Sequence, residues 1–539
     1  MVWSYNGKAL RPTVMTRNGM VACAHPLAAM AGVDVLRAGG NAVDAAVAVS
    51  AALDVTEPFM SGLGGGGAML IRYGGDPVRA LHYGGHFPAG ARLDTLDRVS
   101  IDRGAKAFAV PGAPAGWFAA HAAYGALDMS QVMAPAVALA EEGFALTVTG
   151  ASFFKMAAGR VQEAARQVFM PERTPPLAGT IIRQPALAKT YQRLSQRGVE
   201  DFYTGEIGAA LVRATEAAGG FVNADDLARP QSQWSEPSAS SYRGLNVVST
   251  GWPYTSYEIL LGLNLLGQAD AGSSLDDVRL WHARIEAAKV AMADRVAFGG
   301  ESDALGPGLL SQAYARQRAQ LISANAALLG SGERYARHVA DGAVAPGSPA
   351  DFMRECTTHF DVIDKDGNAV SVTQTLGSIF GSGFMDPVTG ILLNNLMFFF
   401  DLDADSPMSI NLGEMRSGPI SPMMLFKDDV LFLMLGTPGA FGIPQTTLQM
   451  VSNVVDLGMS VQAAIEAPRF RLFGGRKVAI ESRLDSGVAE ALKKRGHELQ
   501  MLSAWSPTVG GGHGILVDPQ TGVFSGGADP RRDGYALGF

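Results

Sequence analysis

The sequence has few of the residues that mark cross-linked, zinc-bound or nucleic-acid-binding proteins. Only two of its 539 residues are cysteines, Cys23 and Cys356, which excludes a disulfide framework and a cysteine-based zinc site. Charged residues make up 17% of the chain, and the formal net charge of −8 comes without a long run of one sign. This pattern indicates neither a nucleic-acid partner nor a polybasic membrane patch, so we expect a small-molecule partner.

Long hydrophobic runs are missing as well. No segment is apolar for long enough to span a bilayer, and the first twenty residues carry positive charges without the apolar stretch of a signal peptide. We therefore expect a cytoplasmic protein that does not contact a membrane. Hydrophobic residues are 47% of the chain, which is typical of a large globular interior. Its length is compatible with several domains or with one continuous core, so the number of domains stays open.

The first part of the chain combines helical and glycine-rich segments. Residues 25–58 predict two helices separated by Gly39 and Gly40, with Asn41 as the N-cap of the second. The following run SGLGGGGAML, residues 61–70, is compatible with an anion cradle or with close backbone packing beside a strand. Close packing is favoured, because the lysine of a P-loop and a GxGxxG motif are both missing.

The rest of the chain changes character near its two-thirds point. Residues 105–350 have a mainly helical pattern, interrupted by proline and glycine, which suggests a helical cover. Residues 338–356 lack periodicity and are the best candidate for an exposed connection. Residues 357–539 alternate strands and turns. Together these patterns predict an α+β or layered α/β architecture.

Two common catalytic patterns are not supported. His82 and His86 have the spacing of metal ligands on a helix, but Gly84 and Gly85 disfavour a helix there and no glutamate lies between the histidines. A GxSxG nucleophile motif is absent too, because the GSG of residues 381–383 lacks its spacing. We therefore expect neither a metal nor another cofactor.

Residues 355–376, ECTTHFDVIDKDGNAVSVTQTL, read as two strands joined by a turn at residues 364–368. This register sets Thr357 and Thr358 opposite Thr375 and Leu376 to within one residue. A hydroxyl on one strand then reaches a hydroxyl on the other. Taken alone, the pattern is also compatible with a purely structural pair, because threonine is a good strand former.

The wider sequence resembles the γ-glutamyltranspeptidase family of N-terminal-nucleophile hydrolases along nearly its whole length. The segments that carry the resemblance are GGNAVDAAVA (39–48), SGLGGGGAML (61–70), VPGAPAGW (110–117), FYTGEIG (202–208), ADDLA (224–228), EAAKVAMADR (286–295), TTHFDVIDKDGNAVSVTQTL (357–376), TGILLNN (389–395), GTPGAFGIPQTTLQMVSNVVDLGM (436–459), EAPRF (466–470) and GADPRRDGYA (527–536).

This resemblance implies a precursor that cuts its own backbone between Cys356 and Thr357. Fragments 1–356 and 357–539 would stay together in one four-layer αββα sandwich. Thr357 would be the nucleophile, and its freed α-amino group, with a reference pKa of about 7.7–8.0, the general base. By the same resemblance Thr375 would orient the nucleophile, and Gly439 with Ala440, which stand where the family has two glycines, would form the oxyanion hole. Ala440 then requires a φ that is negative or tolerable for a residue with a Cβ atom.

The family's substrate pocket is where the sequence departs from the pattern. Gly84 stands at the position of an arginine that holds the substrate carboxylate, and Leu396 and Phe399 stand where polar residues hold its amino group. The family's serine pair is replaced in the segment Arg416, Ser417, Gly418, Pro419 and Ile420. The segment from Phe400 to Ser421 is also shorter than the family's lid loop.

These replacements remove charge and hydrogen-bond donors, so they predict an acyl group other than ordinary γ-glutamyl, larger and more apolar, with water as the main acceptor. The alternatives are a genuine γ-glutamyl hydrolase or transferase acting on glutathione, with Arg416 or Asp401 restoring the lost charges, and a non-catalytic binding relative. A dimer of processed molecules is a further expectation.

Overall fold

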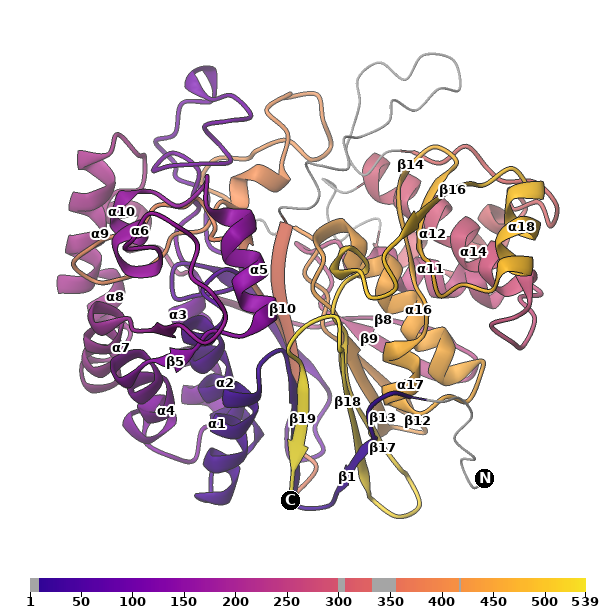
Figure 1. Ribbon diagram of the computed structural model, residues 1–539, viewed down its shortest axis with the longest axis horizontal. Coiled ribbons are helices and arrows are strands. Elements are labelled where there is room, and N and C mark those ends of the chain that lie inside the picture. Colours follow the sequence, from indigo (N-terminus) through magenta and orange to yellow (C-terminus); the bar gives the residue numbers. More distant parts are fainter. Residues whose placement is uncertain (1–8, 299–305, 332–354, 416–417) are drawn as a thin grey trace.

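The computed structural model describes residues 9–298, 306–331, 355–415 and 418–539. Two seven-stranded sheets lie face to face between two groups of helices (Figure 1). The chain therefore has the predicted αββα arrangement of four layers.

The first sheet contains the central hairpin. Its strands are β2 (Gly19–Cys23), β3 (Gly66–Arg72), β4 (Arg79–Tyr83), β7 (Gln233–Ser235), β10 (Glu355–Asp364), β11 (Ala369–Ser378) and β19 (Tyr535–Gly538). They are antiparallel and lie in the order β19-β2-β10-β11-β3-β4-β7. The hairpin β10–β11 is thus flanked on both sides by strands from the N-terminal part of the chain.

The second sheet mixes distant parts of the chain in the same way. Its strands are β1 (Val14–Thr16), β8 (Ser238–Tyr242), β9 (Leu245–Ser249), β12 (Met423–Lys427), β13 (Val430–Gly436), β17 (His513–Val517) and β18 (Phe524–Ala528). Their order is β1-β18-β17-β13-β12-β9-β8. A two-stranded sheet, β5 (Phe144–Ala145) with β6 (Ile181–Ile182), and a three-stranded sheet, β14 (Phe470–Gly474), β15 (Lys477–Glu481) and β16 (Glu498–Leu502), complete the β-structure of the described residues.

One group of helices covers the first sheet. It consists of α1 (Pro26–Arg37), α2 (Ala42–Thr56), α3 (Ala113–Tyr124), α4 (Met129–Glu142), α5 (Val148–Ala157), α6 (Glu163–Phe169), α7 (Pro185–Arg197), α8 (Glu200–Tyr203), α9 (Glu206–Ala217) and α10 (Ala224–Leu227). Asn41 caps α2 by accepting hydrogen bonds from the amides of Val43 and Asp44, as the sequence predicted. All fifteen residues of α2 are buried, which explains its lack of an exposed polar face.

The other group lies beside the second sheet. It consists of α11 (Tyr257–Gly267), α12 (Val278–Phe298), α13 (Gly306–Leu309), α14 (Gln312–Ala319), α16 (Ile443–Val455), α17 (Val461–Glu466) and α18 (Ser486–Lys494). Short 3-10 turns occur at Leu93–Thr95, Leu396–Phe399, Ala440–Gly442 and Pro507–Val509. Buried side chains between the two sheets, Met20, Leu70, Met424 and Ile515 among them, form a separate apolar layer.

The prediction for residues 105–350 was only partly right. This segment does supply most of the helices, but it also contains β7, β8 and β9, which extend both sheets at one edge. Their short, half-exposed sequences such as QWS and SASSY lack the apolar alternation of an interior strand. The predicted exposed connection, residues 338–356, falls mostly outside the described residues.

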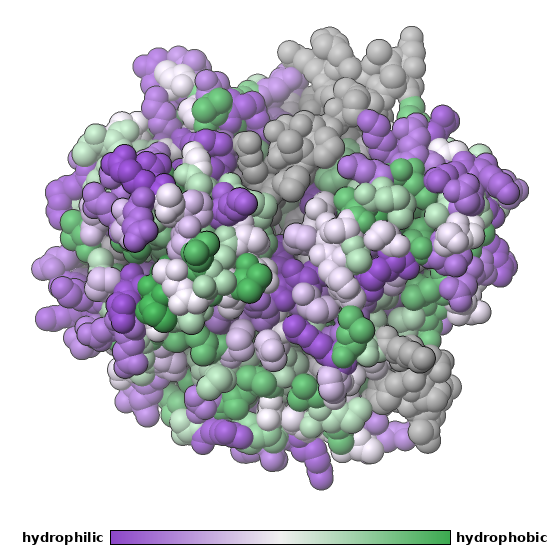
Figure 2. Space-filling model, viewed as in Figure 1, coloured by the Kyte–Doolittle hydropathy of each residue, from purple (hydrophilic) through white to green (hydrophobic). Residues whose placement is uncertain are grey.

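Among the described residues, no helix is both long and apolar enough to cross a membrane. On the face shown in Figure 2, hydrophobic residues form small groups scattered among hydrophilic ones.

Candidate active site

The hairpin β10–β11 has the predicted turn and an irregular end. The carboxylate of Asp364 accepts hydrogen bonds from the amides of Asp366 and Asn368, which closes the turn. At the other end Cys356 lies opposite Gly377, whereas Thr358 lies opposite Gln374. Two residues of β11 therefore face the single residue Thr357. Such a bulge bends a strand and redirects a side chain, which is common next to active sites.

The hydroxyl groups of Thr357 and Thr375 form one hydrogen-bonded chain. Thr357 Oγ1 donates to Thr375 Oγ1 at 3.2 Å, and Thr375 Oγ1 donates to the carbonyl oxygen of Cys356 at 2.5 Å. The amide of Gly377 donates to Thr375 Oγ1 at 2.8 Å. Both threonines are buried. The hydroxyl of Thr375 is thus fixed between the predicted nucleophile and the carbonyl of the predicted cleavage site.

The glycine-rich segment 61–70 packs directly against this end of the hairpin. Gly66 of β3 pairs with Thr375, and a Cβ atom on Gly65 would lie 2.4 Å from the carbonyl oxygen of Thr375. Any larger residue at position 65 would push β11 away. The favoured prediction of close packing beside a strand is therefore confirmed.

A narrow cavity brings most of the predicted site residues together. It is lined by Thr357, Thr375, Leu396, Phe399, Gly418, Pro419, Ile420 and Ala440. Its volume of about 10 Å³ is close to the smallest space that holds one water molecule. A substrate therefore requires the wall formed by residues 396–399 and 418–420 to move outward.

Some predicted residues lie elsewhere. Gly84 follows β4 and packs behind Gly66, where a Cβ on Gly66 would meet its Cα at 3.0 Å, so Gly84 does not line the cavity. Asp401 does not line the cavity either. Its carboxylate accepts a hydrogen bond from the hydroxyl of Ser406 in the same loop. Arg416 and Ser417 lie outside the described residues. Ile420, the last residue of the segment that replaces the family's serine pair, lines the cavity beside Gly418 and Pro419.

The turn that carries the predicted oxyanion hole has an unusual backbone. Gly439 has φ 135° and Ala440 has φ 47°, both in the region that favours glycine. Within the described part of the chain, neither backbone amide donates a hydrogen bond. Buried amides without a partner are rare, and Ala440 shares the lining of the cavity with Thr357, so the two amides match the predicted oxyanion donors in kind.

Replacing Ala440 by glycine should stabilise the protein. Relief of the left-handed conformation gives about 1–2 kcal/mol. The greater freedom of glycine in the unfolded chain takes back about 0.5–1 kcal/mol. We expect a net gain of about 0.5–1 kcal/mol in the free energy of unfolding, measured by urea denaturation. Gly439→Ala is the matched opposite and should destabilise. A loss of stability in Ala440→Gly would contradict the strained backbone at this turn.

Two buried carboxyl groups lie behind the hairpin. Burial raises the pKa of Asp54 to about 7, although Tyr191 and the amide of Leu63 donate hydrogen bonds to it. Burial also raises the pKa of Glu57 to about 7, and Glu57 accepts a hydrogen bond from the hydroxyl of Thr358. Both groups therefore favour folding when they are protonated.

The stability of the protein should depend on Asp54 between pH 4 and pH 7. Because its pKa is raised in the folded state, its contribution is complete at pH 4 and is lost as the pH rises through 7. We expect Asp54→Asn to gain stability relative to the unsubstituted protein as the pH is raised from 5 to 8, measured by urea denaturation. Asn in place of the exposed Asp76 is the control and should show no such trend. A constant difference between Asp54→Asn and the parent would contradict the raised pKa.

The histidines considered as metal ligands have structural partners instead. His82 Nε2 lies 2.5 Å from Ser235 Oγ and its ring stacks on Tyr254, while His86 Nδ1 lies 3.1 Å from Gln231 Oε1. Burial lowers the pKa of His82 to about 4. These contacts join β4 to the segment around β7.

A second group with metal-ligating residue types joins α12 to the residue that precedes β16. His282, Glu286 and His497 are buried and close together. However, His282 Nδ1 and His497 Nε2 share a hydrogen bond of 2.8 Å. The carboxylate of Glu286 binds Lys289 Nζ at 2.7 Å and the amide of Leu328 at 2.8 Å. This network pairs the polar atoms of the cluster with one another and with the backbone, except for His497 Nδ1, which has no hydrogen-bond partner among the described residues.

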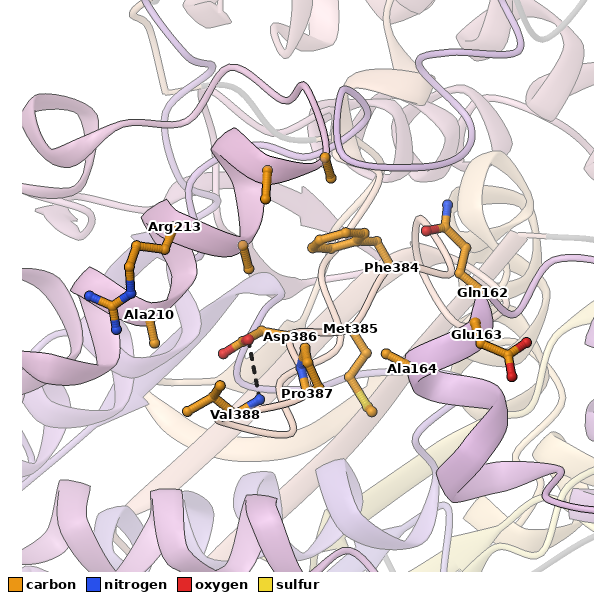
Figure 3. A pocket seen from close by; sticks show the side chains of 13 residues that line it. Gln162, Glu163, Ala164, Ala210, Arg213, Phe384, Met385, Asp386, Pro387 and Val388 are labelled. Carbon is orange, nitrogen blue, oxygen red and sulfur yellow. Dashed lines mark hydrogen bonds between the residues drawn. The ribbon is translucent and has the colours of Figure 1, made fainter.

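A larger cavity of about 510 Å³ lies apart from the threonines (Figure 3). It is open and mostly apolar, between α9, which carries Ala210 and Arg213, and residues 384–388. None of the predicted site residues lines it. Most of the predicted site residues thus line the smaller cavity and none lines the larger one.

The fold and the comparisons with known proteins define the class of protein. The four-layer architecture is that of the N-terminal-nucleophile hydrolases. The family model described as gamma-glutamyltranspeptidase matches residues 28–539, and the chain belongs to this family. It is accordingly an enzyme of the family's amidohydrolase and acyltransferase type.

Similar proteins include enzymes with two kinds of names. The chain is 35% identical over 540 residues to the acylase ACY 1 proenzyme of Pseudomonas sp. strain SE83, covering 96% of this chain and 92% of the relative. It is 32% identical over 549 residues to the glutathione hydrolase proenzyme of Bacillus subtilis strain 168, covering 97% and 92%. The crystal structure of cephalosporin acylase from Bacillus halodurans superposes with a TM-score of 0.89 at 32% identity, covering 99% of this chain and 98% of that one.

Proposed function

We propose that this protein is a self-processing threonine amidohydrolase with Thr357 as its nucleophile. The observation that carries the proposal is the hydrogen-bonded chain from Thr357 Oγ1 through Thr375 Oγ1 to the carbonyl oxygen of Cys356, at the wall of a buried cavity. The proenzyme names of the relatives support it.

The first reaction is the cleavage of the chain itself. Thr357 Oγ1 attacks the carbonyl carbon of Cys356, and the hydroxyl of Thr375 stabilises the negative charge on the carbonyl oxygen. The bond between this carbon and the nitrogen of Thr357 breaks, the nitrogen takes up the proton of the attacking hydroxyl, and an ester on Oγ1 remains. Water hydrolyses the ester, which frees the hydroxyl and the α-amino group of Thr357.

The second reaction is the hydrolysis of an external amide. The α-amino group accepts the proton of Thr357 Oγ1 as the latter attacks the substrate carbonyl, and then gives it to the departing amine. The amides of Gly439 and Ala440 stabilise the oxyanion. The acyl group, now an ester on Thr357, is transferred to water. Cleavage thus creates the base that the catalytic reaction needs.

The two fragments would stay associated after cleavage. Residues 357–539 supply β11 and β19 of the first sheet and, except for Glu355 and Cys356, its strand β10. β2 lies between β19 and β10, and β3 pairs with β11. Separating fragments 1–356 and 357–539 would break these pairings and the apolar layer between the sheets. A cytoplasmic location and a dimer of processed molecules stay predictions from the sequence.

The residues that line the cavity suit an apolar acyl group better than a γ-glutamyl group. Leu396, Phe399, Pro419 and Ile420 surround the space beside Thr357, and no charged residue of the described segments lines it. The ammonium and carboxylate of a γ-glutamyl group would lose their hydration there without gaining a charged partner. The names of the acylase relatives leave the acyl group open, whereas the glutathione hydrolase names favour the γ-glutamyl alternative. Family membership in turn favours catalysis over a non-catalytic binding role.

A hydrolysis screen with one leaving group decides between these acyl groups. Purified processed protein is incubated with the 4-nitroanilides of γ-glutamate, glutarate, hexanoate and phenylacetate. We expect kcat/KM for hexanoyl or phenylacetyl to exceed that for γ-glutamyl by about 100-fold, which corresponds to a few kcal/mol of lost polar contacts. Fastest turnover of the γ-glutamyl compound would reject the apolar preference. A Thr357→Ala sample measures the background for each compound.

A further inference from the structure

The hydroxyl of Thr437 joins the oxyanion turn to a second loop. Thr437 follows β13 directly and is fully buried. Its Oγ1 donates to the carbonyl oxygen of Pro438 at 2.8 Å and accepts a hydrogen bond from the amide of Gly511 at 3.0 Å. This hydroxyl therefore both donates and accepts a hydrogen bond inside the protein.

The hydrogen bond from Thr437 to the carbonyl oxygen of Pro438 controls the direction of the N–H of Gly439. The carbonyl of Pro438 and the N–H of Gly439 belong to one planar trans peptide group, in which they point in opposite directions. Gly439 itself offers little resistance to rotation of this group, because glycine adopts positive and negative φ about equally readily. Holding the carbonyl therefore fixes the direction of the Gly439 N–H.

We infer that Thr437 is a positioning residue that aims the N–H of Gly439 at the acyl oxygen of a substrate bound to Thr357. It touches no reacting atom, and the inference rests on the proposed acyl transfer by Thr357. The following peptide group is held separately, because the amide of Gly442 donates to the carbonyl of Gly439 at 2.8 Å. The hydroxyl of Thr437 and this second bond together orient both oxyanion donors.

The loop that binds Thr437 is itself firmly anchored. Gly510 has φ 89°, and a Cβ atom there would lie 2.4 Å from Thr437 Oγ1. The hydroxyl of Thr446 donates to the carbonyl of Val509 at 3.0 Å, and the amide of Gly512 donates to Asp529 at 2.8 Å. The loop is thus held on both sides of the residue that contacts Thr437.

Asp529 keeps its negative charge in this position. Burial alone would raise its pKa, but the charges of Arg469 and Arg531 outweigh burial and hold the pKa well below its usual range. Arg469 donates to the same carboxylate oxygen as Gly512, at 2.5 Å, and the amide of Arg531 donates to the other oxygen at 2.9 Å. The acceptor that anchors the loop is therefore available over the whole neutral range.

Kinetics of Thr437→Val, which removes the hydroxyl but keeps the shape, test this role. Measured per mole of processed enzyme with the best anilide of the screen, kcat should fall about 10- to 100-fold, somewhat less than the loss of a whole oxyanion donor. KM should stay within about twofold, because the bound substrate gains its oxyanion only in the transition state. Thr437→Ser keeps the hydroxyl and should retain kcat within about threefold.

Thr447→Val is the matched control. Thr447 is also fully buried, but its hydroxyl donates only to Ile443 within α16. Its kcat should equal that of the unsubstituted enzyme. If Thr437→Val fails to fold, Thr437→Cys replaces it, and its weak S–H donor should give about a tenfold lower kcat.

Three results would overturn the inference: unchanged kcat in Thr437→Val or in its Cys substitute, equal losses in Thr437→Val and Thr437→Ser, or an equal loss in Thr447→Val. Failure of the proposed function is a different result. In that case the unsubstituted protein itself would form no acyl ester on Thr357.

Discussion

A Thr357→Ala variant should remain one uncut chain of 539 residues and should hydrolyse none of the anilides above the background of buffer. Alanine has no hydroxyl, so neither the ester with Cys356 nor an acyl-enzyme can form. The side chain is buried at a bulge, and its loss removes one hydrogen bond, so the fold should persist. Electrophoresis of the purified protein over several days measures the cleavage, and circular dichroism checks the fold.

Thr357→Ser is the matched control for this result. Serine keeps the nucleophilic oxygen but lacks the β-branch that restricts χ1, so it should be cut at the same bond, only more slowly. Two fragments appearing in Thr357→Ala would show that another residue supplies the nucleophile. An uncut serine variant would show that the hydroxyl at position 357 is insufficient.

Thr375→Val should slow the cleavage of the precursor by about 100-fold, because removing one donor to an oxyanion typically has an effect of this size. The hydroxyl of Thr375 donates a hydrogen bond to the carbonyl oxygen of Cys356 and accepts one from the hydroxyl of Thr357. Valine has the same shape, so packing against the glycine-rich segment should be unchanged. The half-life of the full-length chain after purification is the measured quantity.

Thr375→Ser separates the hydroxyl from the methyl group at this position. Its half-life should lie within about threefold of the unsubstituted precursor, because the donor to Cys356 is retained. If Thr375→Val is cut at the normal rate, the hydrogen bond seen between Thr375 and Cys356 has no part in the reaction. Equal slowing in Val and Ser would assign the effect to packing.

Local features of the fold were predictable from the sequence. The hairpin follows from its Asp-Gly turn and the strand-forming residues on either side of it. The start of α2 follows from Asn41 and Asp44, which form a capping box. In each case the residues that contact one another are only a few positions apart, so the local sequence is enough to predict the contact.

Features that depend on distant contacts were not predictable. The bulge at Thr357, where two residues of β11 face one residue of β10, is marked in advance by no residue type. Gly84 was assigned to the substrate pocket from the resemblance, whereas it packs behind Gly66. The contact between Thr437 and Gly511 joins residues 74 positions apart. Only the packed molecule brings such residues together.

The backbone at Ala440 is an intermediate case. By the resemblance an alanine stands there in place of a glycine, which led to the expectation of a φ that is negative or tolerable for a residue with a Cβ atom. The sequence does not contain the sign of φ, and the observed value of 47° shows that the turn keeps a glycine-like conformation in spite of the side chain. The backbone of Ala440 is therefore strained, and Ala440→Gly should remove this strain.

Intact-mass spectrometry of the purified protein, before and during turnover of an amide, tests the central claim most directly. The account predicts two fragments, 1–356 and 357–539, with threonine as the first residue of the second. During turnover the second fragment should gain the mass of the acyl group, and peptide mapping should assign it to Thr357. An uncut chain that is active, a cut at another bond, or an acyl group on another residue would contradict the account.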